Sequence, residues 1–191
     1  MTGFIESGYD KRDMQFIPDS DIDTEALPTE YDYNNFCNLE IKDQGSEMIC
    51  VPTSISTMFE SMDYEPLDIY YIYDNRKNKP EEGMMIRDAL KFIQKNLNDS
   101  YFQYYRLNSP LQIKYSIVAN GPCIFALPVR SNDSEFWKGY ENFGGHAIAC
   151  IGFNEEGFIL QNSWGYNWGN NGLTILPYEE INYLIEAWGI V

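Results

Sequence analysis

The sequence predicts an α+β fold, with helices in the first half of the chain and strands in the second. Up to about residue 100, apolar residues recur at helical spacing, whereas later apolar stretches are short and bounded by Gly, Pro or Asn. Of the 191 residues, 44% are hydrophobic, which is enough to bury the core of one domain. Helical and sheet segments that are separate along the chain pack as two lobes, so we expect a cleft between them.

The amino-terminal residues have few periodic apolar positions and many acidic ones. We therefore expect an extended arm at residues 1–26. The domain follows at residues 27–191, with a helical lobe at about residues 27–100 and a sheet lobe at about residues 101–191.

The first helix is expected to begin at Cys50, because apolar side chains then form one stripe at helical spacing. The stripe consists of Val51, Ile55, Met58, Phe59 and Met62. Pro52 supports this boundary, since a proline in the first helical turn lacks only an N–H that would have had no partner. Two further helices are predicted at residues 66–73 and 86–97.

Short apolar segments predict the strands of the second half, with one helix among them at residues 111–119. The predicted strands are residues 101–106, 123–129, 146–152, 158–161 and 173–176.

The charge balance excludes one class of partner. Asp and Glu outnumber Lys and Arg by 29 to 13, which gives a net charge of -16. Because no cluster of Lys and Arg could neutralise a row of phosphates, nucleic acid is not an expected ligand. The acidity is interpreted as a solvated surface in preference to a site for basic peptides.

No apolar run reaches 18 residues, and residues 1–13 lack the basic flank and apolar stretch of an export signal. We therefore expect no membrane partner and a cytoplasmic location, or a virion or host cell if a phage encodes the chain. Without a sign of secretion, the cysteines are expected to be thiols. They are Cys37, Cys50, Cys123 and Cys150.

Four residues could together form a nucleophilic thiol site. Cys50 lies at a helix amino end, where the helix dipole and free N–H groups stabilise a thiolate. His146, the only histidine of the chain, could lower the thiol pKa further and carry the proton. Asn162 could orient the imidazole, and the Gln44 amide could join the Cys50 backbone N–H in stabilising an oxyanion.

The order and local context of these residues resemble the papain-like cysteine peptidases. The motifs are Gln44-Gly45 before Cys50, then Gly145-His146-Ala147-Ile148, and then Asn162-Ser163-Trp164-Gly165 followed by Trp168-Gly169. Further similarity at residues 9–16, 69–71 and 83–90 is to compact bacterial and phage-type members without a long propeptide. The resemblance therefore covers most of the chain.

This resemblance implies a papain-like two-lobe fold with a helical lobe, a β-barrel-like lobe and the active-site cleft between them. It implies catalysis by Cys50, His146, Asn162 and Gln44, with Trp164 shielding the His–Asn hydrogen bond. The substrate-binding residues that it implies are Gly83, Met84, Ala126, Gly145, Ala147 and Trp164. The expected partner of this monomer is a peptide or protein substrate, and neither a cofactor nor a metal is expected.

The chain departs from the family pattern close to the nucleophile. Glu47 replaces a usual cysteine, and Val51 and Pro52 follow Cys50 where an aromatic residue is common. His146 comes early, which implies lost loops and a more open cleft. Two alternatives to a peptidase therefore stay open, namely an inactive module that binds peptides or proteins, and an acyl transferase or deamidase.

Family members are commonly inhibited by an amino-terminal segment in the cleft. Residues 1–26 are too short for a full inhibitory domain, so we expect them to form a structural strap along the back of the domain.

Overall fold

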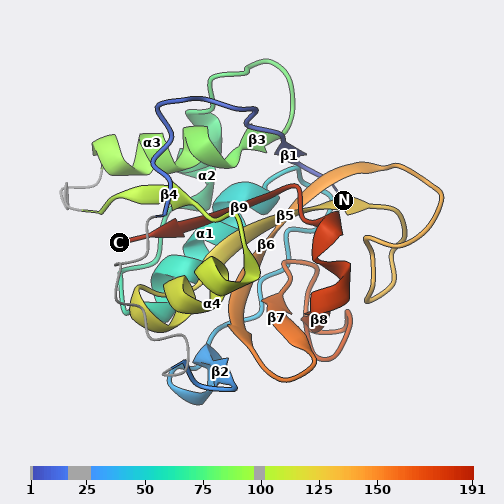
Figure 1. The fold of residues 1–191 in the computed structure, drawn as a ribbon. Coiled ribbons are helices and arrows are strands. Elements are labelled where there is room, and N and C mark those ends of the chain that lie inside the picture. The colour runs from blue at the N-terminus through green and yellow to red at the C-terminus, as the bar shows by residue number, and fades with distance from the viewer. Residues whose placement is uncertain (1, 17–26, 97–101) are drawn as a thin grey trace.

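The computed structural model describes residues 2–16, 27–96 and 102–191, and it has the predicted α+β fold. Figure 1 shows helices α1, α2 and α3 on one side of the long strands β5 and β6, with β7 and β8 on the other side. The strands in these ranges form one curled nine-stranded sheet.

The helices agree closely with the sequence prediction. They are α1 (Cys50–Ser61), α2 (Ile69–Asp74), α3 (Ile86–Asn96) and α4 (Pro110–Ala119), with 3-10 helices η2 (Tyr33–Asn35) and η3 (Tyr178–Tyr183). Helix α2 begins later than expected because the Asp68 side chain accepts a hydrogen bond from the Tyr71 N–H and so caps the helix. Of the helices in the described ranges, none is long and apolar enough to cross a membrane.

The central path of the sheet runs β3-β1-β6-β5-β9-β4, while β2 and β7 also pair with β6, and β8 pairs with β7. The five predicted strands are β4 (Tyr104–Arg106), β5 (Cys123–Val129), β6 (Gly144–Phe153), β7 (Gly157–Gln161) and β8 (Leu173–Pro177). The sequence analysis did not predict β1 (Phe4–Ile5), β2 (Tyr31–Asp32), β3 (Met84–Met85) or β9 (Glu186–Ile190). Strand β9 escaped prediction because all five of its residues are buried, so it shows no alternation of apolar and polar residues.

The sheet separates two apolar clusters, one under the helices and one inside the β lobe. Ala126 and Ala147 belong to the cluster that contains α1 and α3, whereas their chain neighbours Phe125 and Ile148 belong to the other. Helix α1 packs on β6, where the Ser54 hydroxyl donates to the Ala147 carbonyl at 2.9 Å. The start of α1 is therefore fixed against the strand that carries the histidine.

The described part of the arm, residues 2–16, does not lie wholly at the back of the domain. Strand β1 lies between β3 and β6, parallel to β3 and antiparallel to β6. The Gly3 N–H donates to the Gly145 carbonyl at 3.1 Å, and the Met84 N–H donates to the Gly3 carbonyl at 2.8 Å. The expectation of a strap along the back is wrong for residues 2–5, because β3 and β6 leave a gap whose backbone groups need a partner strand.

Candidate active site

Cys50 is the first residue of α1, as the position of Pro52 predicts. The first backbone bond of the helix runs from the Thr53 N–H to the Ile49 carbonyl, at 3.1 Å. Pro52 precedes that bond, so its missing N–H removes no helical hydrogen bond. The unusual proline is thus compatible with a regular helix start beneath Cys50.

The Cys50 sulfur lies against the histidine strand. The backbone N–H of Ala147 points at Cys50 Sγ with an N to S distance of 3.5 Å. His146 is the residue of β6 directly before Ala147. The contact therefore brings Cys50, at the start of α1 in the helical lobe, next to the strand of the sheet lobe that carries His146. Both side chains are fully buried, with 0% of their surface exposed.

Asn162 orients the imidazole of His146. The His146 Nε2 to Asn162 Oδ1 distance is 2.7 Å, and Asn162 Oδ1 also accepts the Ser163 N–H at 2.8 Å. Because Oδ1 can only accept, Nε2 must carry the proton. Among the described residues, His146 Nδ1 has no hydrogen-bond partner. In the neutral ring it is therefore an available base.

Aromatic rings surround this histidine. The Trp164 ring lies over His146 with centroids 4.6 Å apart, and Phe136 meets the imidazole edge to face at 5.5 Å. Phe136 is fully buried. The two rings exclude water from the His146–Asn162 hydrogen bond, which strengthens it.

The Gln44 side chain has a fixed orientation. The Gln44 backbone N–H donates to the Ser163 carbonyl at 2.8 Å, and the Ser163 hydroxyl donates to Gln44 Oε1 at 2.6 Å. The Gln44 Nε2 group donates to the Glu47 carbonyl at 2.7 Å, within the loop that leads to Cys50. Hydrogen bonds therefore join the loop before the cysteine to the loop after the asparagine.

Burial keeps both reactive groups neutral. Loss of solvent raises the pKa of the Cys50 thiol to about 12, although backbone N–H groups of Ala147 and Val51 act to lower it. Burial likewise lowers the pKa of His146 to about 3, against the opposite effect of the Asn162 hydrogen bond. The sequence analysis expected a Cys50 thiolate, stabilised by the helix start and by a charged His146. In this conformation burial instead favours the neutral thiol and the neutral imidazole.

Comparisons with known proteins support the motif analysis. A family model described as papain family cysteine protease matches residues 8–186. The chain belongs to the papain family of cysteine proteases. Two relatives from Caenorhabditis elegans are named as cysteine proteinases, in agreement with a hydrolase.

Solved structures of the papain family share the fold. Xylellain, a cysteine protease from Xylella fastidiosa, has a TM-score of 0.78 at 21% identity, with 99% of this chain and 95% of that chain covered. The bromelain protease from Ananas comosus, in complex with the E64 inhibitor, has a TM-score of 0.70 at 17% identity, with 86% and 99% covered.

Sequence relatives match over shorter stretches. An uncharacterized peptidase C1-like protein of Acanthamoeba polyphaga mimivirus is 49% identical over 57 residues, which are 27% of this chain and 18% of that protein. Mexicain from Jacaratia mexicana is 32% identical over 77 residues, or 37% of this chain and 36% of mexicain. The chain thus spans about a third or less of the length of these curated relatives.

Three of the residues that the family resemblance assigns to substrate binding, Gly83, Met84 and Gly145, lie against the arm, whereas Trp164 lies over His146. A side chain at Gly83 would lie 2.9 Å from the Gly3 carbonyl oxygen, and one at Gly145 would overlap the Phe4 ring. Met84 pairs with Phe4 in the register of β1 and β3. Ala126 and Ala147 lie in the same buried cluster as Phe4.

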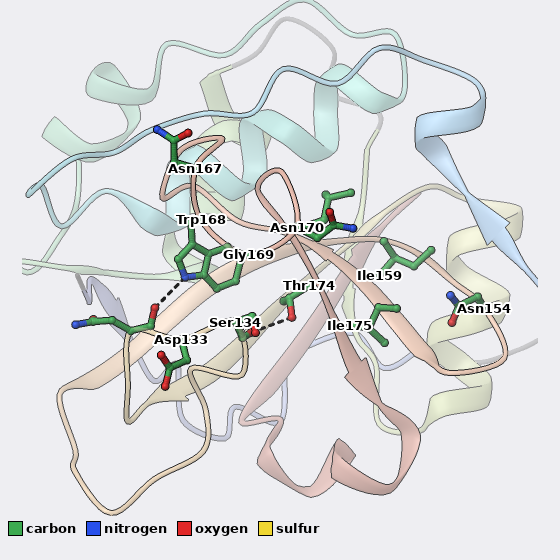
Figure 2. A pocket seen from close by; sticks show the side chains of 12 residues that line it. Asp133, Ser134, Asn154, Ile159, Asn167, Trp168, Gly169, Asn170, Thr174 and Ile175 are labelled. Carbon is green, nitrogen blue, oxygen red and sulfur yellow. Dashed lines mark hydrogen bonds between the residues drawn. The ribbon is translucent and has the colours of Figure 1, made fainter.

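The hollow in Figure 2, with a volume of about 830 Å³, lies beside the site, because Trp168 in its wall packs edge to face against Trp164. Its walls include the loop at residues 132–134, the segment at residues 167–170 and side chains of β7 and β8. It contains none of the residues predicted for catalysis or substrate binding. Between β3 and β6, the space is occupied by β1 of the arm.

Two residues around His146 and Gln44 were not predicted from the sequence. Ser163 was detectable, because it belongs to the Asn-Ser-Trp-Gly motif and its hydroxyl needs a partner when buried. Phe136 gave no signal, because it lies in a loop outside every motif. Within the described ranges, no three His, Cys, Asp or Glu side chains are grouped to hold a metal ion.

Proposed function

We propose that the protein is a thiol peptidase that hydrolyses peptide bonds of peptide or protein substrates through an acyl-enzyme intermediate. One observation carries the proposal. His146 Nε2 donates a 2.7 Å hydrogen bond to Asn162, and within the described ranges Nδ1 has no partner. The backbone N–H of the next residue, Ala147, contacts Cys50 Sγ. A thiol, an oriented base and a fixed amide donor are the groups that acyl transfer requires.

The reaction begins with transfer of the Cys50 proton to His146 Nδ1. The resulting thiolate attacks the substrate carbonyl carbon, and a C–S bond forms as the carbonyl oxygen takes the negative charge. The amide of Gln44 and the backbone N–H of Cys50 at the helix start stabilise this oxyanion. Gln44 Nε2 carries two N–H groups, so one can stay on the Glu47 carbonyl while the other donates to the oxyanion.

The imidazolium then gives its proton to the leaving amine, and the C–N bond breaks. A water molecule, deprotonated by the same imidazole, attacks the thioester and releases the acid product and the Cys50 thiol. Asn162 keeps the ring oriented in both half-reactions, and Trp164 keeps water from its hydrogen bond.

The experiment that tests this proposal is covalent labelling. Because bromelain is known in complex with E64 and shares the fold, we expect E64 to bond to Cys50 and abolish hydrolysis of a casein or peptide substrate. Cys37 supplies the matched control, since it is a partly exposed free thiol outside the Gln44-to-Cys50 motif.

Labelling and hydrolysis should be lost in Cys50→Ala and kept in Cys37→Ala. If Cys50→Ala retained peptide hydrolysis, Cys50 would be excluded as the nucleophile and the proposal would be rejected.

A further inference from the structure

The hollow of Figure 2 lies on the His146 side of the proposed active site. The Trp164 ring covers His146 with centroids 4.6 Å apart, and Trp168 meets Trp164 edge to face at 5.3 Å. Trp168 lines the hollow. In the proposed reaction His146 gives its proton to the leaving amine, so the substrate chain beyond the cleaved bond lies on this side of Cys50. The hollow therefore begins two aromatic rings away from the proposed base, on the side of the leaving group.

One wall of this hollow is an open edge of the sheet. Among the described strands, β8 pairs only with β7. Leu173 and Asn170 donate their backbone N–H groups to each other's carbonyl oxygens, at 3.1 and 2.9 Å, so the backbone groups of Leu173 point away from β7. Backbone groups alternate between the two edges of a strand, so those of Ile175 point the same way as those of Leu173.

Ile175 offers a free donor and a free acceptor at the hollow. It is one of the lining residues, and within the described ranges neither its N–H nor its carbonyl has a hydrogen-bond partner. An extended peptide carries both groups at the spacing that such an edge pairs with. The edge therefore favours a peptide backbone as its ligand.

The side chains of the hollow also suit an extended peptide. Ile159 and Ile175 are directly paired between β7 and β8, and both line the hollow as a small apolar strip. Amide groups, which can donate to and accept from a peptide backbone, lie around it. They belong to Asn132, Asn154, Asn167 and Asn170.

A second hollow of about 370 Å³ adjoins the first, because Asn154 and Ile159 line both. Its other walls include the Phe36 ring, which is 68% exposed, and the carboxylates of Glu30 and Asp32. We call the two hollows together the outer groove. It leads from Trp168 across β7 to the segment that contains Phe36.

The outer groove is acidic. Asp133 lines its first hollow, and Glu30 and Asp32 line the second. The lining residues in the described ranges include neither Lys nor Arg. A basic peptide segment is attracted to such a surface and an acidic one is repelled.

We propose that the outer groove is a second binding site for the leaving-group side of a protein substrate, which pairs its backbone with Ile175 and places basic side chains near Asp133 and Glu30. The inference rests on the proposed function, because the cleaved substrate chain leads into the groove. Pro177, two residues after Ile175, has no N–H, so the edge pairs with only a short stretch. These contacts lie far from the cleaved bond and therefore lower KM for long substrates.

Substrates of two lengths test the proposal. The short one is a peptide with an aminocoumarin leaving group, and the long one continues for about ten lysine-containing residues beyond the cleaved bond, about 33 Å when extended. We expect Asp133→Lys and Glu30→Lys each to raise the ratio of long-substrate KM to short-substrate KM about fivefold, as when an exposed charge contact turns from attraction to repulsion.

Glu65→Lys is the matched control, since it makes the same change of charge at an exposed residue outside the outer groove. It should leave the ratio as it is in the unaltered protein. A ratio that is equal in all four proteins would overturn the outer groove.

Hydrogen exchange tests the backbone pairing without catalysis. The probe is the lysine-containing segment alone, added to the unaltered protein at millimolar concentration. We expect it to slow exchange of the Ile175 amide, with the Leu176 amide as the matched control, because the Leu176 N–H faces β7 and is protected already. An Ile175 amide that exchanges equally fast with and without the peptide would overturn the proposal.

The two experiments separate the outer groove from the proposed function. Protection of the Ile175 amide in a protein that hydrolyses neither substrate would support the outer groove and reject the peptidase. Hydrolysis of both substrates, with equal KM ratios and no protection of Ile175, would do the reverse.

Discussion

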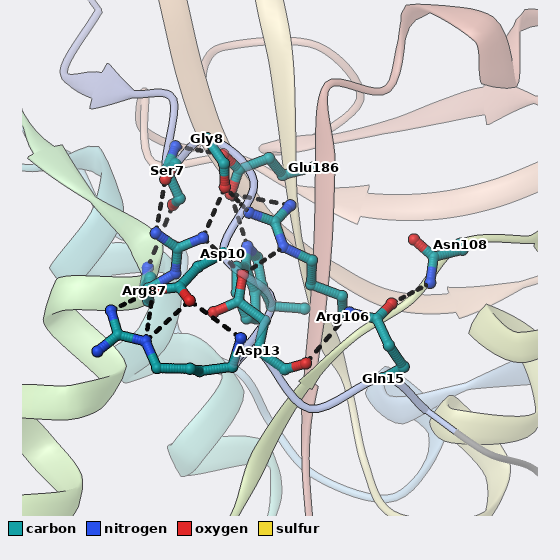
Figure 3. Close-up of polar contacts among 11 residues, drawn as sticks. Ser7, Gly8, Asp10, Asp13, Gln15, Arg87, Arg106, Asn108 and Glu186 are labelled. Carbon is teal, nitrogen blue, oxygen red and sulfur yellow. Dashed lines mark hydrogen bonds and ion pairs between the residues drawn. The ribbon is translucent and has the colours of Figure 1, made fainter.

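Substitution of Asp13 by Asn should destabilise the protein more than any other single change of charge on the arm. The Asp13 carboxylate lies between the guanidinium groups of Arg87 and Arg106 (Figure 3), and its side chain is 2% exposed. An amide keeps the shape but removes the negative charge, so two cations would face each other without their shared partner.

The magnitude follows from the burial of the three groups. Loss of one partner from a buried ion pair costs about 3–5 kcal/mol. The Arg87 and Arg106 side chains are 10% and 16% exposed, and Glu186 lies 3.9 Å from Arg106, so water and Glu186 offset part of the loss. We therefore expect a decrease of about 3 kcal/mol in the free energy of unfolding, or about 6–12 °C in Tm for a chain of this size.

Urea denaturation followed by tryptophan fluorescence measures this change. Asp10→Asn is the matched control, because Asp10 pairs with Arg12, whose side chain is 78% exposed, and water screens that pair. The control should differ little from the unaltered protein. A loss for Asp13→Asn no larger than for Asp10→Asn would refute the view that the buried network holds residues 7–16 of the arm.

Three further predictions concern the site. Gln44→Ala should lower kcat for peptide hydrolysis by about 10²-fold or more with a smaller effect on KM, because the amide acts on the oxyanion; a change in KM alone would contradict that role. His146→Gln should reduce the acid sensitivity of the urea midpoint. The folded-state pKa of about 3 lies below the ordinary 6.5, so the unaltered protein loses stability as pH falls from about 6.5 to 3, and the variant lacks this part of the loss; equal losses in both proteins would contradict a neutral buried ring. Gly83→Ala should accelerate exchange of the Met84 amide, since its φ of +81° and the 2.9 Å approach to Gly3 leave no room for a methyl group; unchanged exchange would contradict close packing of residues 2–5.

The sequence was most informative where residues carry motifs or helical periodicity. The stripe that begins at Cys50 predicted the start of α1 at the correct residue, since helix periodicity and a first-turn proline act over a few positions. The structure also brings His146 within a hydrogen bond of Asn162 and places Ala147 against Cys50. The motifs predicted these neighbours because each has one chemical role in the family.

Long-range structure was much harder to predict. Strands β1 and β3 have two residues each, too few to show alternation, and they pair across 80 positions of the chain. Glu186 is a charged residue in a buried strand, and its burial depends on partners such as the Ser7 N–H and the Arg106 guanidinium, which lies 3.9 Å away. Neither arrangement leaves a local pattern, because the groups that stabilise it come from distant segments.

The central claim, that Cys50 attacks the substrate with His146 as its base, is tested most directly by trapping the acyl-enzyme. The unaltered protein is mixed with a peptide ester, quenched in acid and digested, and the mass of the fragment containing Cys50 is measured. We predict a fragment heavier by the acyl group in this protein and no adduct in His146→Ala. Ester turnover without an adduct on Cys50, or an equal adduct in the His146→Ala chain, would contradict the mechanism.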